Sequence, residues 1–178
     1  KMDNIDIPEM FEKLPDDGGK YIHWAKTDKV FCKQRKNLSI KKIEGKGYGL
    51  VTNVEVKAGD LLIKEKPIFS MRSLKDDANC SKSEMILVEY LPRRNLEKVD
   101  FIDLVSLNGI GSRDGQISNL FPFITRINHS CSPNCAWYDI DGFQEVRAVR
   151  DMKPGTELLT CYSSKVIGDR ENRRSFFK

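Results

Sequence analysis

The pattern of hydrophobic and polar residues changes character near Leu38. From that point, short apolar or alternating runs are separated by two glycine-containing segments, Gly45-Lys46-Gly47 and Ala58-Gly59-Asp60. Runs of this length, bounded by turn residues, are typical of β-strands joined by tight turns. The strands expected in this region are residues 38–43, 48–53 and 61–66.

The middle of the chain carries helical signals instead. Ser81-Lys82-Ser83-Glu84 fits a capping box, and the helical pattern that follows it ends before Pro92. A second helix is expected over residues 96–107, because Asn108-Gly109 ends its pattern. The glycine-rich and polar residues 109–119 are expected to form a loop.

The last third of the chain returns to strand-like patterns. Residues 136–140 and 143–149 flank Asp141-Gly142, a pair that marks a β-hairpin. Residues 128–134 are rich in turn formers, and residues 157–162 give another short strand. These patterns predict a mostly β domain with a central helical insertion and a C-terminal helix. The expected organisation is a lead-in over residues 1–37, strand-rich parts over residues 38–70 and 120–165, the helical insertion over residues 71–119 and the start of a helix over residues 166–178.

The length of 178 residues fits one domain, and a composition of 39% hydrophobic and 31% charged residues is typical of a globular protein in water. The sequence contains no apolar run as long as a membrane span requires. Its first residues, Lys1-Met2-Asp3-Asn4, do not lead into the apolar core of a secretory signal. We therefore expect an intracellular protein, with the nucleus and the cytoplasm both open.

The net charge of +4 does not by itself indicate a nucleic-acid-binding protein. The basic residues are nevertheless unevenly spread, because residues 26–46 contain eight lysines and arginines against only Asp28 and Glu44. A face of this kind could contact nucleic acid or an acidic partner. A solvated surface is the simpler interpretation, so direct nucleic-acid binding is allowed but not required.

The five cysteines are odd in number and contain no C-x-x-C pair, so we expect reduced thiols. Cys131 and Cys135 have a C-x3-C spacing that supplies at most half of a zinc site. Only His23 and His129 are present, which excludes a histidine-rich metal site. His129, Ser130 and Cys131 do not indicate a hydrolase, since catalytic groups of that kind normally converge from distant parts of a chain.

Three segments occur in an order that indicates more than each does alone. Gly45-Lys46-Gly47-Tyr48-Gly49 is a weak signal by itself, because a turn or bulge explains it equally well. It is followed by Arg-Ile-Asn-His-Ser-Cys-Ser-Pro-Asn at residues 126–134, and then by residues 146–162, which end in Tyr162. In this order, across residues 38–162, the segments resemble the signatures of SET-domain protein lysine methyltransferases.

Within that family the sequence is most similar to the SET-and-MYND group and its fungal relatives, because an Arg-rich segment over residues 169–174 follows the closing tyrosine. Residues 73–119 contain one cysteine and no histidine, so no MYND zinc module is expected there. No cysteine-rich post-SET segment precedes Lys178. In family members that have such a segment, the cysteine matching Cys131 helps to bind zinc. Cys131 would do so only if a post-SET segment exists outside this chain, and as the chain stands it is expected to be a buried thiol.

The resemblance implies a fold of several short curved sheets and S-adenosylmethionine as the cofactor. The backbone around Lys46, Gly47 and Tyr48 would hold the methionine part of the cofactor. Asn128 would complete this pocket with its side chain, and His129 would contact the adenine largely through backbone atoms. A polar pair that only satisfies a buried turn is the alternative for Asn128 and His129.

The resemblance also implies that Tyr162 is the catalytic tyrosine, beside both the cofactor and the substrate. The substrate would be a lysine side chain of a protein, with a histone tail as one candidate. The lysine amine must be neutral to attack, and an apolar channel favours the neutral form. The remaining aromatic candidates for this channel are Phe121, Phe123, Tyr138 and Phe143, each of which equally suits ordinary core packing.

Two other functions remain open from the sequence. A catalytically silent SET domain could serve as a chromatin or protein interaction module, and the basic residues 26–46 would suit that role. A basic nucleic-acid binder with incidental similarity would show salt-dependent DNA affinity and no cofactor binding. The presence of Tyr162, Asn128 and the glycine segment together favours the enzyme.

Overall fold

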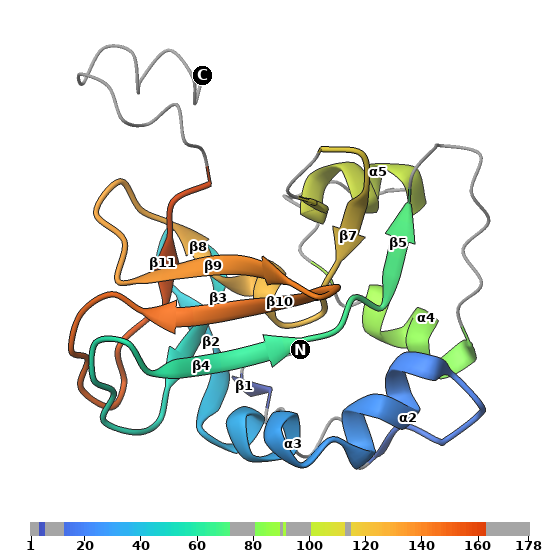
Figure 1. Ribbon diagram of the computed structural model, residues 1–178, viewed down its shortest axis with the longest axis horizontal. Coiled ribbons are helices and arrows are strands. Elements are labelled where there is room, and N and C mark those ends of the chain that lie inside the picture. Colours follow the sequence, from blue (N-terminus) through green and yellow to red (C-terminus); the bar gives the residue numbers. More distant parts are fainter. Residues whose placement is uncertain are drawn as a thin grey trace.

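The computed structural model describes residues 4–5, 13–71, 81–89, 91, 101–112 and 115–162. Within these residues, four small sheets of two or three strands lie beside short helices (Figure 1). The elements in chain order are β1 (Asn4–Ile5), α2 (Lys20–Thr27), α3 (Lys29–Lys36), β2 (Leu38–Ile43), β3 (Gly47–Thr52), β4 (Leu61–Glu65), β5 (Phe69–Met71), α4 (Lys82–Glu89), α5 (Phe101–Asn108), β6 (Ile110–Gly111), β7 (Ser118–Leu120), the 3-10 helix η1 (Ile124–Arg126), β8 (Asn128–His129), β9 (Cys135–Ile140), β10 (Phe143–Ala148) and β11 (Leu159–Thr160). The expected mostly β fold of several small sheets is confirmed.

Two antiparallel hairpins follow the predicted pattern. β2 pairs with β3, and Gly45 and Gly47 at the turn between them have positive φ angles of 72° and 80°. β9 pairs with β10 around Asp141 and Gly142, whose φ angles of 52° and 77° fit a tight two-residue hairpin turn. β10 also pairs with β4, so these three strands form one sheet.

The sheet formed by β5, β6 and β7 is not predicted by the sequence. Residues 109–119, expected as a loop, contain β6 and the start of β7, and β7 lies between β5 and β6. The expectation of a loop throughout this segment is therefore wrong. Strands of two or three residues are too short to show an alternating pattern, so their pairing depends on tertiary contacts.

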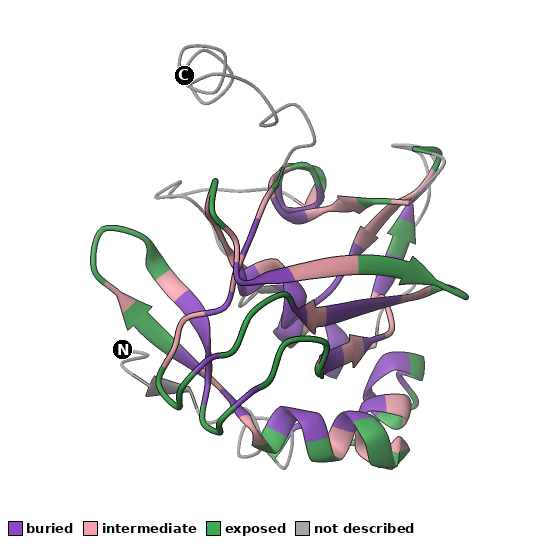
Figure 2. Ribbon diagram, turned by 60° about the vertical axis from the view of Figure 1, so that its left-hand side comes forward, coloured by how far each residue is buried: buried purple, intermediate pink, exposed green. Residues whose placement is uncertain are grey.

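The helices α2 and α3 lie along one side of the molecule and complete its main core (Figure 1). Tyr21, Ile22 and Ala25 of α2 and Phe31 of α3 are at most 2% exposed. The ring centroids of Trp24 and Phe31 lie 4.6 Å apart. Figure 2 shows both helices banded with buried and exposed residues, as amphipathic helices that cover a core should be. The segment expected as a lead-in thus supplies core residues.

A buried carboxylate joins α2 to the segment that follows β7. Glu65 is fully buried, and its Oε1 accepts hydrogen bonds from the Tyr21 hydroxyl at 2.6 Å and the Phe123 N–H at 3.1 Å. Its Oε2 accepts the Ile124 N–H at 2.9 Å. Burial raises the pKa of Glu65 to about 7, and these hydrogen bonds and the Arg126 guanidinium limit the rise. Glu65 therefore fixes the first turn of η1, just before β8.

The predicted helix start at Ser81 is confirmed. The Ser81 N–H donates to Glu84 Oε2 at 2.8 Å, and the Glu84 N–H donates to Ser81 Oγ at 3.2 Å. The second predicted helix is present as α5, while its expected first residues and the predicted helix from residue 166 onward lie outside the described residues. In the described part of the chain, no helix has both the length and the apolar character that crossing a membrane requires.

Candidate active site

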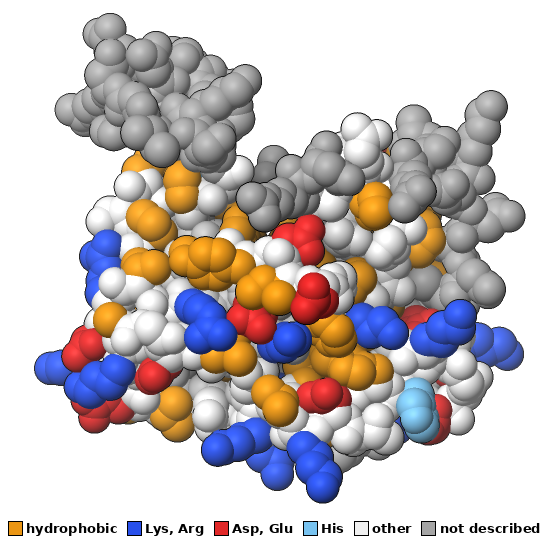
Figure 3. All heavy atoms as spheres, viewed as in Figure 1, with side chains coloured by type: hydrophobic (Ala, Val, Ile, Leu, Met, Phe, Trp, Pro, Cys, Tyr) orange, Lys and Arg blue, Asp and Glu red, His pale blue; other side chains and the backbone are white. Residues whose placement is uncertain are grey.

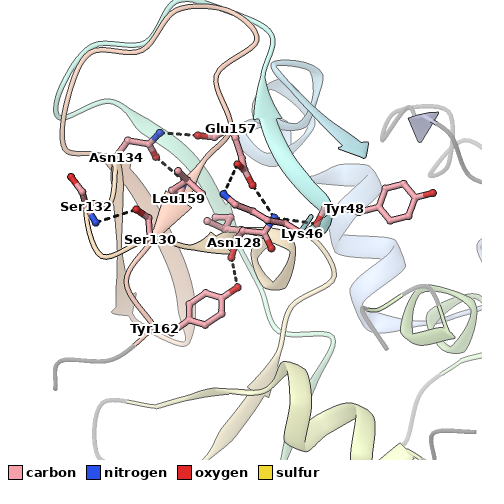
Figure 4. Close-up of polar contacts among 10 residues, drawn as sticks. Lys46, Tyr48, Asn128, Ser130, Ser132, Asn134, Glu157, Leu159 and Tyr162 are labelled. Carbon is pink, nitrogen blue, oxygen red and sulfur yellow. Dashed lines mark hydrogen bonds and ion pairs between the residues drawn. The ribbon is translucent and has the colours of Figure 1, made fainter. Parts of the chain in front are cut away.

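The candidate site forms where three segments distant in the sequence meet, namely the start of β3 and the strands β8 and β11 (Figure 4). β8 lies parallel to β11, with Asn128 opposite Leu159 and His129 opposite Thr160. The pairing continues past β8, because the Ser130 N–H donates to the Thr160 carbonyl at 2.9 Å. The two later signature segments of the sequence are therefore direct neighbours.

Asn134 ties the loop after β8 to β11 from its other end. The side-chain amide nitrogen of Asn134 donates to the Glu157 carbonyl at 2.7 Å, and its Oδ1 accepts the Leu159 N–H at 2.7 Å. The Asn134 backbone N–H donates to the Leu159 carbonyl at 3.0 Å. Because Asn134 is only 7% exposed, water cannot easily replace these bonds. Asn134 thus fixes the backbone on both sides of Leu158.

We expect Asn134→Asp to destabilise the fold by about 1–3 kcal/mol, because a carboxylate cannot donate to the Glu157 carbonyl and repels its oxygen. Urea denaturation followed by circular dichroism measures the change. Asn53→Asp is the matched control, since Asn53 Oδ1 accepts from the Ser39 hydroxyl at an exposed site and a carboxylate keeps that acceptor. Equal stability of the two variants would contradict the role assigned to Asn134.

Four residues form one polar cluster beside the start of β3. Glu157 Oε2 lies 3.0 Å from Lys46 Nζ, and Glu157 Oε1 accepts a hydrogen bond from Asn128 Nδ2 at 2.8 Å. The same Asn128 nitrogen lies 3.5 Å from the Tyr48 carbonyl oxygen. In Figure 4 the Tyr48 ring points away, so its carbonyl is the part that faces the cluster. The structure brings the predicted residues Lys46, Tyr48 and Asn128 together around Glu157.

Because Gly49 has no side chain, the polar cluster can occupy the space next to its Cα atom. A Cβ atom at position 49 would lie 2.8 Å from Glu157 Oε1, 2.9 Å from Ile43 Cγ1 and 3.0 Å from Asn128 Nδ2. Distances this short mean that a side chain at position 49 would displace the Glu157 carboxylate and the Asn128 amide. Gly47 differs, because its positive φ favours glycine while the space around it is open.

The sequence assigns no role to Glu157, although this residue lies in the closing signature segment. The available signal is an acidic residue shortly after Gly155, and a single carboxylate near a turn usually faces solvent. In the structure the Glu157 side chain is only 16% exposed and contacts groups from residues 46 and 128. Sequence reasoning misses Glu157 because contacts over such separations do not appear in local patterns.

Tyr162 lies beside β8 with its hydroxyl already oriented. The hydroxyl donates to the Ile127 carbonyl at 2.7 Å, and the Tyr162 N–H donates to His129 Nδ1 at 3.2 Å. The Tyr162 ring is nearly parallel to the Trp137 ring at a centroid distance of 6.1 Å. Tyr162 is 42% exposed, and a hydroxyl oxygen that donates its proton can still accept a hydrogen bond. The Tyr162 hydroxyl oxygen therefore keeps the capacity to accept a further hydrogen bond.

His129 is held in one protonation state by its neighbours. Since Nδ1 accepts the Tyr162 N–H, the proton of the neutral ring is on Nε2, which lies 3.3 Å from Cys131 Sγ. Burial, together with the Lys46 charge, lowers the pKa of His129 below its ordinary value of 6.5. The His129 ring is therefore neutral at neutral pH and adds no charge beside Tyr162.

The four aromatic residues predicted to line a lysine channel lie in different surroundings. Phe121 and Phe123 are buried in the main core, at 2% and 0% exposure. The Phe143 ring centroid lies 6.0 Å from that of Trp24. Tyr138 is 47% exposed on β9. The channel role of these four residues stays a prediction.

Trp137 is an aromatic neighbour of Tyr162 that sequence reasoning misses. Adjacent residues of a strand point to opposite faces, so Tyr138 turns away from the face on which Trp137 meets Tyr162. The sequence shows two consecutive aromatic residues and does not reveal which one faces the site. The register of β9 against β10, with Trp137 opposite Val146, decides this.

The expectation that Cys131 is a buried thiol is wrong, because Cys131 is exposed. It lies in the bend after β8, between the contacts that Ser130 and Asn134 make with β11. Among the described cysteines, Cys135 is buried. Its thiol donates to the Leu159 carbonyl at 3.2 Å, and burial raises its pKa to about 12. Among the described residues, no group of three or more His, Cys, Asp or Glu is placed to hold a metal ion.

Comparison with known proteins places these features in context. The SET domain model matches residues 47–163. N-lysine methyltransferase SMYD2-B of Danio rerio is 45% identical over 62 residues, covering 33% of this chain and 14% of that protein. The H3 lysine-36 specific histone-lysine N-methyltransferase of Chaetomium globosum is 28% identical over 141 residues, covering 74% of this chain and 14% of that protein. The solved polycomb repressive complex 2 of Chaetomium thermophilum aligns over 75% of this chain and 15% of that chain, with 21% identity and a TM-score of 0.44. The chain thus spans 14% of the length of the two curated relatives.

Proposed function

The chain belongs to the SET-domain family, and on that basis we propose that it transfers a methyl group from S-adenosylmethionine to a lysine side chain of a protein. The proposal is supported most by the meeting of Lys46, Asn128 and Tyr162, from three separate segments, around β8 and β11. The two relatives described above are named as lysine methyltransferases, and one of them as histone-specific, which makes histones the first substrates to test.

The polar cluster fits the amino-acid end of S-adenosylmethionine, which carries an ammonium and a carboxylate. The Glu157 carboxylate, the Tyr48 carbonyl and the Asn128 amide offer acceptors to the ammonium. Lys46 offers a cation to the carboxylate. The missing Cβ of Gly49 keeps these groups within reach of one another. The same residues that form the cluster would therefore hold this part of the cofactor, and His129 would contribute backbone contacts to the adenine.

When bound, the cofactor supplies a methyl group on a positively charged sulfur. A lysine nitrogen would take up that methyl group, and the electron pair of the broken carbon–sulfur bond would stay on sulfur. The Tyr162 hydroxyl oxygen would accept a hydrogen bond from the lysine amine and so orient its lone pair. Because the hydroxyl proton is donated to the Ile127 carbonyl, this oxygen is available as an acceptor.

The lysine amine must lose its proton before it can attack. With a reference pKa near 10.4, keeping it neutral at pH 7 costs about 4–5 kcal/mol unless the site lowers that pKa. The Trp137 and His129 rings beside Tyr162 carry no charge that would favour the ammonium form, and removal from water disfavours it. The amine would therefore give up its proton to solvent before it enters the site.

Mass spectrometry of histones incubated with the chain and S-adenosylmethionine tests the proposal, with a gain of one or more methyl groups on lysine as the expected result. Calorimetry measures cofactor binding separately. A folded chain that binds no S-adenosylmethionine and methylates no protein in a broad panel would overturn the enzymatic function and favour a silent interaction module.

Gly49→Ala is expected to weaken S-adenosylmethionine binding about tenfold or more, equivalent to about 1.4 kcal/mol. The added methyl group would displace the Glu157 carboxylate and the Asn128 amide, which lie 2.8 Å and 3.0 Å from the Cβ position. Calorimetry measures the affinity. Gly111→Ala is the matched control, because Gly111 has no atom within 4 Å of its Cβ position and no positive φ. Equal affinities of the two variants would show that the cofactor does not use this cluster.

A further inference from the structure

The basic residues 26–46 divide into two groups once their surroundings are known. Arg35 is 9% exposed, Lys26 donates to the Leu14 carbonyl at 2.6 Å, and Lys46 is paired with Glu157. The side chains of these three residues are therefore buried or already bonded to other groups of the protein. The other five are exposed and have no ion-pair or hydrogen-bond partner among the described residues: Lys29, Lys33, Lys36, Lys41 and Lys42.

Three of the five exposed lysines form a stripe on α3. Lys29, Lys33 and Lys36 are spaced by four and three residues, so they lie within an arc of about 60° on one face of the helix. Helix α3 contains no acidic residue, and Asp28 at its N-cap accepts a hydrogen bond from the Phe31 N–H at 2.8 Å. Figure 3 shows lysine and arginine side chains along the lower edge of the molecule, where Figure 1 places α2 and α3.

Several acidic residues elsewhere on the described surface pair with other cations. Glu55 and Asp151 contact Lys57 at 2.7 Å and 3.2 Å. Glu145 contacts Lys64 at 3.3 Å and Arg147 at 2.9 Å. Lys29, Lys33 and Lys36 form no ion pair with a described carboxylate, so a polyanion outside the chain is the partner that complements their charge.

We propose that the lysine stripe Lys29, Lys33 and Lys36 docks on the phosphate backbone of double-stranded DNA. From Lys29 to Lys36 the helix rises about 10 Å, and one DNA strand carries about three phosphates over the same length. Three charges on the stripe thus meet three charges on the backbone.

An acidic polypeptide fits the stripe less well. An extended chain advances about 3.3 Å per residue and alternates its faces, so it presents one charge per about 6.6 Å on one side. Single-stranded nucleic acid is also less suitable, because such strands are normally held by aromatic stacking. The large hydrophobic residue exposed on α3 is Val30, which cannot stack on bases. Duplex backbone contact, without reading of sequence, is the interaction that remains.

Fluorescence anisotropy with a mixed-sequence DNA duplex and the 178-residue chain tests this docking over a range of salt concentrations. We expect the logarithm of the association constant to fall linearly with the logarithm of salt concentration. Lys29→Gln/Lys33→Gln/Lys36→Gln should make that slope about 3 units less steep, at about 0.9 per phosphate contact, and weaken binding about tenfold or more at low salt.

The matched control is Lys20→Gln/Lys82→Gln/Lys153→Gln, three exposed lysines outside α3 that form no ion pair with a described residue and whose replacement changes the net charge equally. For this control variant, the logarithm of the association constant should fall with the logarithm of salt concentration as steeply as for the unaltered chain. An equal loss in both triple variants, or no loss in the α3 variant, overturns the proposal. Tighter binding of poly-glutamate, single-stranded DNA or duplex RNA of matched charge also overturns it.

This inference does not depend on methyl transfer, because the readout is binding in the absence of S-adenosylmethionine. A chain that proves catalytically silent can still pass the test, and an active methyltransferase can fail it. All three replaced residues on α3 are exposed and take no part in the core, so the variant is expected to fold, which circular dichroism checks.

Discussion

Replacing Tyr162 by phenylalanine is expected to lower the rate of lysine methylation by about 100-fold or more. The change removes the hydroxyl that donates to the Ile127 carbonyl at 2.7 Å and would accept a hydrogen bond from the substrate amine. The ring, its parallel contact with Trp137 and the backbone hydrogen bond to His129 all remain. Single-turnover kinetics with a methylatable histone or peptide measures the effect.

Two measurements separate this loss of turnover from damage to the fold. Loss of one hydrogen bond at a partly exposed site costs about 1 kcal/mol, so the melting temperature should fall by no more than about 2–4 °C. Affinity for S-adenosylmethionine should change little, because the polar cluster is untouched. Tyr138→Phe, which lies on the opposite face of β9 and keeps the aromatic ring that a channel position would need, is expected to retain activity. If Tyr162→Phe methylates lysine as fast as the unaltered chain, the Tyr162 hydroxyl has no role in methyl transfer.

Raising the pH from about 5 to about 8 is expected to remove about 3 kcal/mol of stability that depends on Glu65. Burial raises the pKa of folded Glu65 to about 7 from an ordinary value of 4.5, so the folded state binds this proton more tightly than the unfolded state. The contribution of Glu65 is therefore fully present below pH 4.5 and is lost as the pH rises through about 7.

The Glu65 effect is isolated by comparison with Glu65→Gln, which does not titrate. Urea denaturation at several pH values should show the extra fall in stability for the unaltered chain and not for this variant. His129, whose lowered pKa acts in the opposite direction, contributes equally to both and cancels in the difference. Glu55→Gln, at an exposed carboxylate, should behave like the unaltered chain. Parallel pH profiles for Glu65→Gln and the unaltered chain would show that Glu65 does not titrate in this range.

Local patterns were sufficient for much of the fold. The β2–β3 and β9–β10 hairpins are predictable because alternation and turn residues such as Asp141-Gly142 act over a few positions. The start of α4 is predictable for the same reason, since the Ser81 and Glu84 capping contacts join residues three apart. The order of the three signature segments was enough to predict that the segments carrying Lys46, Asn128 and Tyr162 lie together, while the function of these residues stays a prediction.

The remaining features depend on contacts between distant residues, which no local pattern encodes. The parallel pairing of β8 with β11 joins residues about thirty positions apart. The Glu157 contact with Lys46 and the Trp137 contact with Tyr162 arise only when the strands are in register. The exposure of Cys131 follows from the direction of the bend in the chain after β8.

The Tyr21–Glu65 hydrogen bond bears on where the functional unit of this protein begins. The SET domain model starts at residue 47, yet Glu65, which fixes the turn before Asn128, takes one of its hydrogen bonds from Tyr21. A domain boundary drawn at the edge of the family match would therefore cut through the folding unit. Substitutions at Tyr21 or Phe31 should be read as changes to the hydrophobic core that supports the candidate site rather than as variation in a dispensable N-terminal extension.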